Sequence, residues 1–302
     1  MKQKIMHMFF PGNNVSPFDV NMIADSGYSI VMPYTGLVAD DVTALTQDCI
    51  YSRPPGSAAD TGIFIGGFDV NMAEDMVNNV TANMQPPFEV SVMVDPNGAY
   101  TTSAALVALI SSALNTNNQS LNGSLVTIYG GGPVGNCAAV LAARNGASVR
   151  IARLTEGSKE KQTYVEEFLA RYDVKAEQVD ARNDAGKLAA MKNAQVLISS
   201  ARAGVEVLSQ KLITDGCNAT VVADVNAVPP AGIAGVGLQD SGKPLDYLNR
   251  CKGIGALAIG NIKYQTQSTL LKQMQEASGG AKVFGLSDAF SVASDLAEKA
   301  GA

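Results

Sequence analysis

The 302-residue chain has no tryptophan, one histidine and four cysteines, and these scarcities exclude several kinds of chemistry. None of the cysteines, Cys49, Cys137, Cys217 and Cys251, belongs to a C-x-x-C pair or fits a zinc spacing. His7 lies in an apolar run, which suits a strand residue better than a catalyst. We therefore expect no metal site, no nucleophile activated by histidine, and four free thiols in a reducing compartment.

Long basic stretches and long apolar stretches are also missing. Charged residues make up 17% of the chain and the net charge is −6, so nucleic acid and anionic membrane surfaces are not expected partners. The first apolar run stops at Pro11–Gly12, and glycines or polar residues interrupt every later one. We expect no signal peptide, no membrane span and a cytoplasmic protein.

The hydrophobic pattern alternates between strands and helices, which implies parallel sheets with helices on their faces. Strands are predicted at 4–10, 29–34, 63–67, 90–94, 125–129, 148–152, 195–199 and 220–225, and less clearly within 253–260. Helices are predicted at 18–25, 40–48, 69–84, 101–114, 136–145, 159–171, 205–213, 264–277 and 287–299.

A polar stretch without periodicity, residues 115–123, reads as a linker. The sequence therefore predicts two α/β domains, a size that 302 residues can support with two cores. The first comprises residues 1–118 together with about 266–302, because the C-terminal helices are expected to pack back on it. The second, residues 119–265, is expected to be a Rossmann-like, doubly wound parallel sheet.

The strand predicted at 125–129 runs into a glycine cluster and then into a small-residue helix. The fingerprint G-x-G-x-x-G consists of Gly130, Gly132 and Gly135, with Pro133 and Val134 between the last two. Its first glycine allows a sharp turn, the second lets the backbone approach a pyrophosphate, and the third brings the helix close to the strand. The helix N-terminus then offers N–H groups to phosphates. A glycine turn without a ligand is the alternative.

The end of the next strand favours NADP over NAD. NAD sites usually carry an acid there for the ribose hydroxyls, whereas this strand continues into Arg153. A guanidinium can bind a 2′-phosphate through two hydrogen bonds, and an acid would repel it. Glu156 is close enough in sequence to keep NAD open, and Arg153 could also be only a solvated strand-end charge.

Two further strand ends are predicted to face the nicotinamide, because ligands of doubly wound sheets sit outside the carboxyl ends of the strands. Ser200 and Ala201 follow the strand at 195–199, and Asn226 follows the strand at 220–225. Small residues around them leave room for the nicotinamide ribose and ring.

The pentapeptide Phe-Asp-Val-Asn-Met occurs twice, at 18–22 and 68–72. The flanking residues differ and no third copy exists, so the chain is not a repeat protein. Asp19 and Asp69 both fall in the first turn of a predicted helix, where a carboxylate stabilises the helix dipole. That role is sufficient for Asp69.

Six stretches spread over nearly the whole chain carry motifs of one enzyme family. They are residues 16–20, 61–67, 95–102, 130–135, 224–235 and 253–265, and the last two are far more specific than a glycine fingerprint. Together they resemble the methylene-tetrahydromethanopterin dehydrogenases of methylotrophic and related bacteria. The resemblance implies two α/β domains with the active cleft between them, and a soluble homo-oligomer, a trimer or a hexamer.

The resemblance also implies a reaction of one-carbon metabolism, in formaldehyde oxidation. The methylene carbon between two pterin nitrogens loses a hydride to NAD(P)+ and leaves a methenyl cation. The nitrogen lone pairs expel the hydride, so the chemistry needs orientation and negative potential but no metal. By this resemblance Asp19 and Lys263 lie at the pterin site, where Asp19 could stabilise the cation and Lys263 could hold a pterin oxygen.

Asn97, Thr101 and Thr102 lie at a strand-to-helix turn and could also reach the substrate. Each of these five residues also has a simpler interpretation: a dipole acid for Asp19, a surface lysine for Lys263, and turn or cap residues for the other three. Two other functions stay open. Methylene-tetrahydrofolate shares the reacting ring, and a non-catalytic NADP-binding sensor would bind the nucleotide without turnover.

Overall fold

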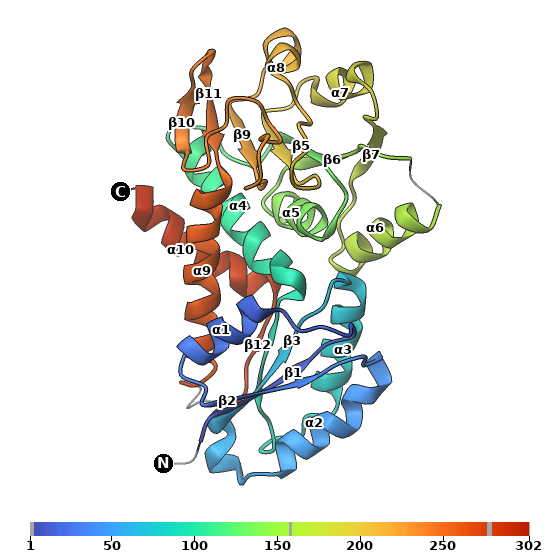
Figure 1. Ribbon diagram of the computed structural model, residues 1–302, viewed down its shortest axis with the longest axis vertical. Coiled ribbons are helices and arrows are strands. Elements are labelled where there is room, and N and C mark those ends of the chain that lie inside the picture. The colour runs from blue at the N-terminus through green and yellow to red at the C-terminus, as the bar shows by residue number, and fades with distance from the viewer. Residues whose placement is uncertain (1–2, 157–158, 277–279, 302) are drawn as a thin grey trace. The chain divides into compact units, whose positions relative to one another are not determined.

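The computed structural model describes residues 3–156, 159–276 and 280–301 (Figure 1). The chain divides into two units, Met1–Thr101 with Tyr264–Val292, and Thr102–Lys263 with Ala293–Ala302. Each contains its own sheet, which confirms the predicted α/β class with two sheets. The division falls inside α4 (Ala99–Asn115), upstream of the polar segment 115–123 at which the sequence places the domain boundary.

The first unit is built on a parallel sheet with the strand order β12-β4-β3-β1-β2. The strands are β1 (Ile5–Phe9), β2 (Ile30–Tyr34), β3 (Thr61–Ile65), β4 (Ser91–Val94) and β12 (Val283–Phe284). Every residue of β3 is buried, as expected for a central strand covered on both faces. The chain order reverses between β1 and β3, so the carboxyl ends of these two strands form the switch point of this sheet.

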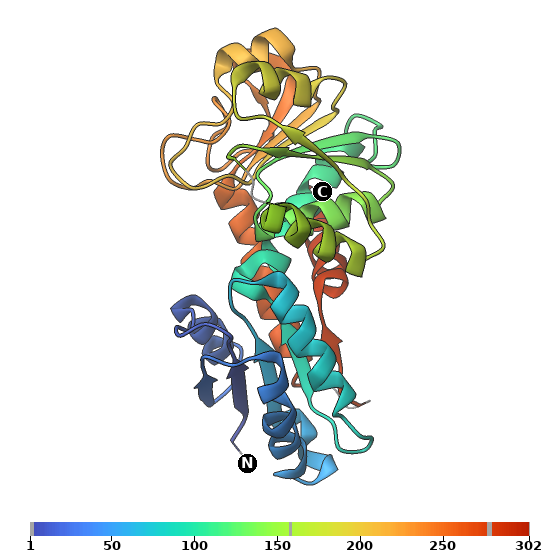
Figure 2. The ribbon, with the colours of Figure 1, turned by 90° about the vertical axis from the view of Figure 1, so that its right-hand side faces the viewer.

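Helices cover both faces of this sheet (Figures 1 and 2). On one face lies α1 (Pro17–Asp25), hydrogen-bonded to the C-terminal part of α9 (Ala256–Gln273). On the other lie α2 (Val42–Tyr51) and α3 (Val70–Ala82), which contact each other. Short 3-10 helices, η1 (Ala39–Asp41), η2 (Pro55–Asp60) and η3 (Pro96–Gly98), connect some of the elements, and α10 (Leu286–Gly301) follows β12.

The two copies of the pentapeptide fold in different registers. In α1 the N-cap is Ser16, whose Oγ accepts the N–H of Asp19 at 3.4 Å, so Asp19 lies inside the helix and is buried. In α3 the acid is itself the N-cap, because Oδ1 of Asp69 accepts the N–H groups of Asn71 at 2.9 Å and Met72 at 3.1 Å. Asp69 is exposed and serves the helix end, which accounts for its presence without any ligand.

The second unit contains a seven-stranded sheet with the order β10-β11-β9-β8-β5-β6-β7. The strands are β5 (Leu125–Tyr129), β6 (Ser148–Arg153), β7 (Glu177–Asp180), β8 (Val196–Ser199), β9 (Val221–Asp224), β10 (Ser241–Leu245) and β11 (Leu248–Ile254). All neighbours are parallel except the β10–β11 hairpin. From β7 to β11 the order is that of a Rossmann sheet, 3-2-1-4-5-6, which confirms the prediction and places the switch point between β5 and β8.

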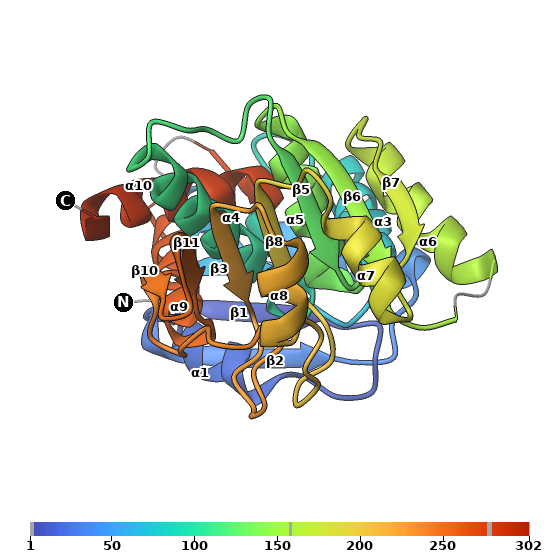
Figure 3. The same cartoon turned by 90° about the horizontal axis from the view of Figure 1, so that it is seen from above.

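Alternation along β5 explains how this sheet holds helices on two faces. Thr127 Oγ1 donates to the carbonyl of Ala190 at 2.9 Å, and the hydroxyl of Tyr129 donates to the carbonyl of Lys187 at 2.8 Å. Both acceptors belong to α7 (Asp184–Met191), which packs beside α8 (Gln210–Gly216; Figure 3). The intervening residues of β5 face the opposite way, as the period of a strand requires, toward α5 (Pro133–Arg144) and its neighbour α6 (Lys159–Arg171).

One predicted helix begins later than expected. Residues 205–213 were expected to be helical, but α8 starts only at Gln210, after the N-cap Ser209. Leu208 instead forms a β-bridge with Ile233, and this tertiary pairing takes the backbone groups that a helix would need.

The C-terminal glycine-rich stretch also differs from the prediction. A strand was expected within 253–260 and a helix from 264, whereas β11 ends at Ile254 and α9 already begins at Ala256. The strand β7 was not predicted because its sequence, Glu-Gln-Val-Asp, has no apolar run. It is an edge strand, where half-exposed polar residues are tolerated.

The single histidine is a strand residue, as predicted. His7 is a residue of β1, its Nδ1 lies 3.1 Å from the hydroxyl of Tyr34, and burial lowers its pKa, helped by the charge of Arg53. All four cysteines are buried, and none of them forms a disulfide. Across the described ranges, no helix combines the length and the hydropathy that crossing a bilayer requires.

Two buried tyrosines allow a test of the hydrogen-bond pattern. Tyr28 is 3% exposed and its hydroxyl has no partner among the described residues, whereas the hydroxyl of Tyr129 is bonded to α7. Tyr28→Phe is expected to leave the free energy of unfolding unchanged or to raise it by about 1 kcal/mol, and Tyr129→Phe to lower it by about 1 kcal/mol. Urea unfolding of both variants measures the difference. A clear loss of stability in Tyr28→Phe would contradict the description of its hydroxyl.

Candidate functional site

The glycine turn lies at the carboxyl end of β5, on the switch point of the second sheet. Gly130 has φ +120°, and a Cβ there would lie 2.8 Å from the carbonyl oxygen of Ser200. The side chain of Ser200 in turn donates to the carbonyl of Gly130 at 2.9 Å. Only glycine satisfies both the left-handed conformation and this close approach, so the turn after β5 is fixed against the segment after β8.

Among the described residues, no side chain caps the N-terminus of α5. Gly132 is the N-cap and has no side chain to offer, and a Cβ there would meet nothing within 4 Å. Pro133 has no N–H, and the first amide of the helix with a helical partner is that of Asn136, which donates to Gly132 at 2.9 Å. The N–H groups of Val134 and Gly135 precede it and have no carbonyl within the helix to bond. This end can hold a pyrophosphate.

The third glycine allows close packing. A Cβ at Gly135 would lie 2.1 Å from the carbonyl oxygen of Gly130 and 2.6 Å from Oγ of Ser200. The three glycines thus differ: the first turns the chain, the second leaves open space, and the third lets α5 lie against the turn. This is the geometry that the fingerprint predicts for a dinucleotide.

The residues predicted near the nicotinamide differ in burial and in whether their side chains are already hydrogen-bonded. Ser200 and Ala201 are half-buried at the switch point. Asn226 is 5% exposed and its side chain is used by the loop after β9: Oδ1 accepts the N–H groups of Gly204 and Val228, and Nδ2 donates to Pro230. We therefore expect Asn226 to influence a cofactor through the shape of this loop.

Asp224, the last residue of β9, organises the same loop and was missed in the sequence. Its carboxylate is 2% exposed and accepts the N–H groups of Asn226 at 3.1 Å, Gly232 at 2.6 Å and Ile233 at 3.2 Å. Burial raises the pKa of Asp224, although these N–H donors act in the opposite direction. The sequence did hold a signal for this role, because Asp224 ends an apolar strand and precedes a loop that contains prolines and glycines.

Four charged residues gather at the carboxyl ends of β6 and β7. Arg153 ends β6, is half-buried and pairs in register with Asp180, which ends β7. Arg182 binds Asp180 through Nε and Nη2, and its Nη1 lies 3.6 Å from Glu156. Sequence reasoning found Arg153 and Glu156, but not Asp180 and Arg182, because β7 was not predicted.

In the first unit, the predicted catalytic acid lies inside the protein. Asp19 is 2% exposed, and its Oδ1 accepts Nε2 of Gln267, on α9, at 3.0 Å. Gln267 is fully buried, so the amide holds the carboxylate in one orientation. Lys263, the other predicted catalytic residue, is half-buried and precedes Gln267 by one turn of α9.

The turn after β4 separates the three residues predicted to contact substrate. Asn97 is exposed and has φ +50°, a conformation that asparagine tolerates. Thr101 is fully buried: its hydroxyl donates to Oδ2 of Asp95 at 2.7 Å and its N–H to Oδ1 at 3.1 Å. Thr102 is half-buried. Asp95, also missed in the sequence, thus fixes the turn that presents Asn97.

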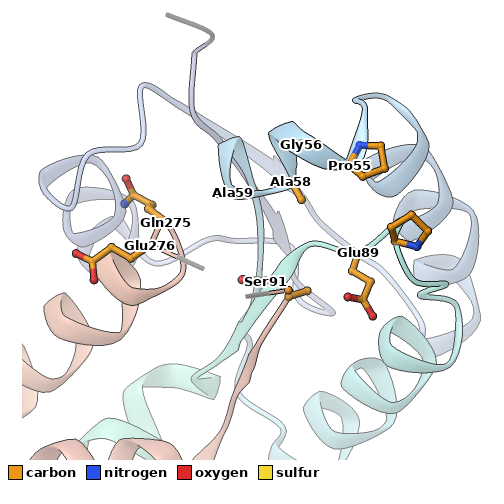
Figure 4. A pocket seen from close by; sticks show the side chains of 11 residues that line it. Pro55, Gly56, Ala58, Ala59, Glu89, Ser91, Gln275 and Glu276 are labelled. Carbon is orange, nitrogen blue, oxygen red and sulfur yellow. The ribbon is translucent and has the colours of Figure 1, made fainter. Parts of the chain in front are cut away.

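A cavity of about 490 Å³ in the first unit lies at the other edge of its sheet (Figure 4). Its lining comes from η2, from the start of β4 and from the segment after α9. Among the described residues it includes Glu89 and Glu276 but no basic side chain. In a parallel sheet the carboxyl edge is the ligand edge, and two carboxylates repel phosphates. This cavity therefore does not belong to the candidate site.

Comparisons with known proteins bear on the same regions. Residues 17–97 match the family model described as methylene-tetrahydromethanopterin dehydrogenase, N-terminal. A protein of Methylorubrum extorquens named NAD(P)-dependent methylenetetrahydromethanopterin dehydrogenase is 41% identical over 280 residues, which cover 92% of this chain and 93% of the relative. The bifunctional protein MdtA of the same organism is 31% identical over 312 residues, 98% of this chain and 100% of the relative.

A solved structure shares the fold. An NAD-dependent malic enzyme from Thermotoga maritima matches with a TM-score of 0.55 over 96% of this chain and 84% of that chain. The sequences are 13% identical, so this likeness concerns architecture and not activity.

The glycine turn generates a paired prediction. Gly135→Ala places a methyl group against backbone, so we expect a marked loss of stability and of nucleotide binding together. Gly132→Ala fits the protein, so stability should stay within about 1 kcal/mol while nucleotide affinity falls, because the methyl group enters the pyrophosphate space. Thermal melts and nucleotide titrations measure the two effects. Unchanged affinity in a folded Gly132→Ala variant would refute the assignment of this turn to a nucleotide.

Proposed function

Since the chain belongs to the family of NAD(P)-dependent methylene-tetrahydromethanopterin dehydrogenases, we propose that it oxidises 5,10-methylene-tetrahydromethanopterin to the methenyl form with NAD(P)+ as the hydride acceptor. The observation that carries this proposal is the 41% identity over 92% of the chain, because so long a match includes the glycine turn as well as the first unit. The geometry at α5 supports it independently, since its open N-terminus fits a pyrophosphate.

The proposed chemistry requires the protein mainly to position the two reactants against each other. One C–H bond of the methylene group breaks, its electron pair leaves with the hydrogen as hydride to NAD(P)+, and the positive charge spreads over the two flanking nitrogens. A fixed carboxylate stabilises such a developing cation more than a mobile one, because no reorganisation is needed during the reaction. Asp19, held by Gln267, is our candidate for this role.

The remaining roles follow from position. Lys263 is proposed to hold a polar atom of the pterin, and Asn97, exposed on its turn, is proposed to contact the same substrate. Thr101 supports this contact from within because its hydroxyl donates to Asp95, and the half-buried Thr102 is proposed as a further substrate contact. In the second unit Gly132, Pro133, Val134 and Gly135 would bind the pyrophosphate, with Ser200 and Ala201 beside the nicotinamide half.

We further propose a preference for NADP, a cytoplasmic location and a homo-oligomeric state. The preference rests on Arg153, which stands at the strand end where NAD sites usually carry an acid. The other two rest on the resemblance to the family, and sedimentation equilibrium would test for a trimer or a hexamer.

The first test is a set of parallel rate measurements on the purified protein. We expect NADP+ reduction with methylene-tetrahydromethanopterin to be fast, slower with NAD+, and slow or absent with methylene-tetrahydrofolate. If turnover with methylene-tetrahydrofolate equals or exceeds that with methylene-tetrahydromethanopterin, the folate compound is the substrate to assign. Tight NADP+ binding without turnover on either carrier would instead favour a nucleotide sensor.

The repeated pentapeptide supplies a matched control for the catalytic acid. Asp19→Asn keeps the size of the side chain and removes its charge, so kcat/KM should fall by about 100-fold in a folded protein. Asp69→Ala removes an N-cap and should cost about 1 kcal/mol of stability with kcat/KM unchanged. Steady-state kinetics and circular dichroism of both variants, with Lys263→Ala beside them, separate the two roles. Normal kinetics in both Asp19→Asn and Lys263→Ala would refute the assignment.

A further inference from the structure

We propose that Arg182 determines nucleotide specificity together with Arg153, by holding the 2′-phosphate of NADP, and that Asp180 is the anion with which that phosphate competes. This inference rests on the proposed function, because it requires a dinucleotide on the second unit. It adds two residues, Asp180 and Arg182, that no motif of the chain identifies.

The location follows from the topology of the sheet. In a Rossmann sheet the ribose of the adenosine half lies beyond the end of the second strand, which is β6 here. The neighbouring third strand is β7, and the two lie side by side (Figure 3). Arg153 is in register with Asp180, and Arg182 follows Asp180 by two residues. Both guanidinium groups therefore stand at the strand ends where a ribose phosphate is expected.

Both carboxylate oxygens of Asp180 accept hydrogen bonds from Arg182. Its Oδ1 accepts the backbone N–H and Nε of Arg182, both at 3.0 Å, and its Oδ2 accepts Nε at 2.9 Å and Nη2 at 2.6 Å. These bonds, with a smaller effect of Arg153, hold the pKa of Asp180 at about 2, so the carboxylate is ionised at neutral pH. It cancels one of the two positive charges and places the guanidinium of Arg182.

The rest of the Arg182 side chain is held weakly. Nη1 lies 3.6 Å from Glu156, whose side chain is 91% exposed. An exposed ion pair at this distance contributes little. A phosphate carries close to two negative charges and accepts paired hydrogen bonds from a guanidinium, so it can displace Glu156 at Nη1 and compete with Asp180 for the charge of Arg182. Arg153 adds a second donor, since its Nε is buried without a partner among the described residues.

The same four residues can also serve NAD. Without a 2′-phosphate, the ribose 2′-hydroxyl can donate to a carboxylate, and Asp180 and Glu156 both stand at this edge. Removing Arg182 would release Asp180 to pair with Arg153, so neither cation would remain available to the phosphate. Removing the charge of Asp180 would have the opposite effect, because both guanidinium groups would then act on the phosphate.

Three variants of the full chain test this with calorimetric titrations of NADP+ and NAD+. Arg182→Ala should weaken NADP+ binding by about tenfold or more and leave NAD+ binding within about twofold. Asp180→Asn should tighten NADP+ binding several-fold. The control is Glu177→Gln, which removes the charge of another acid on β7, paired with Arg150 of β6 at 2.9 Å near the amino ends of these strands. It should change neither affinity.

Each outcome decides one point. Equal losses for both nucleotides in Arg182→Ala would assign Arg182 a purely structural role and overturn the inference, as would no loss for either. If Arg182→Ala selectively weakens NADP+ binding but the wild-type protein turns over neither carrier, the proposed reaction is refuted and the inference about Arg182 stands. Wild-type protein that binds neither nucleotide would refute both.

Discussion

The candidate nucleotide site depends on one close approach of backbone to backbone. The turn after β5 and the segment after β8 meet where the order of the sheet reverses, and neither Gly130 nor Gly135 has room for a Cβ. Because the two strand ends are fixed against each other, α5 starts at a defined point, and the N–H groups of Val134 and Gly135 there have no carbonyl within the helix to bond. The position of the candidate anion site is therefore a consequence of sheet topology.

The elements whose residues carry a strong local pattern could be predicted from the sequence. The apolar β-branched run of β5, the glycine fingerprint and the Ser16–Pro17 helix start were found within a residue or two. The β7 strand and its charged end could not be found, because an edge strand of polar residues differs little from a loop until its neighbour is known. Asp180 and Arg182 were missed for this reason alone.

Identical local sequence did not give identical local structure. The pentapeptide Phe-Asp-Val-Asn-Met puts its acid at the N-cap of α3 but inside α1, because Ser16 precedes the first copy and takes the capping position. The acid displaced into α1 then meets Gln267, which is 248 residues away in sequence. Pattern reasoning could place both acids at a helix start, but only the tertiary partner separates an exposed cap from a buried, oriented carboxylate.

The β10–β11 hairpin has a consequence for self-association. It closes one edge of the seven-stranded sheet with an antiparallel strand, and that strand contains Lys243 and Pro244. Proline cannot donate to a further strand, and the lysine ammonium, 63% exposed in its side chain, must stay hydrated. A strand from another molecule would find poor pairing there. The sheet that carries the candidate nucleotide site is thus protected at this edge against growth into aggregates.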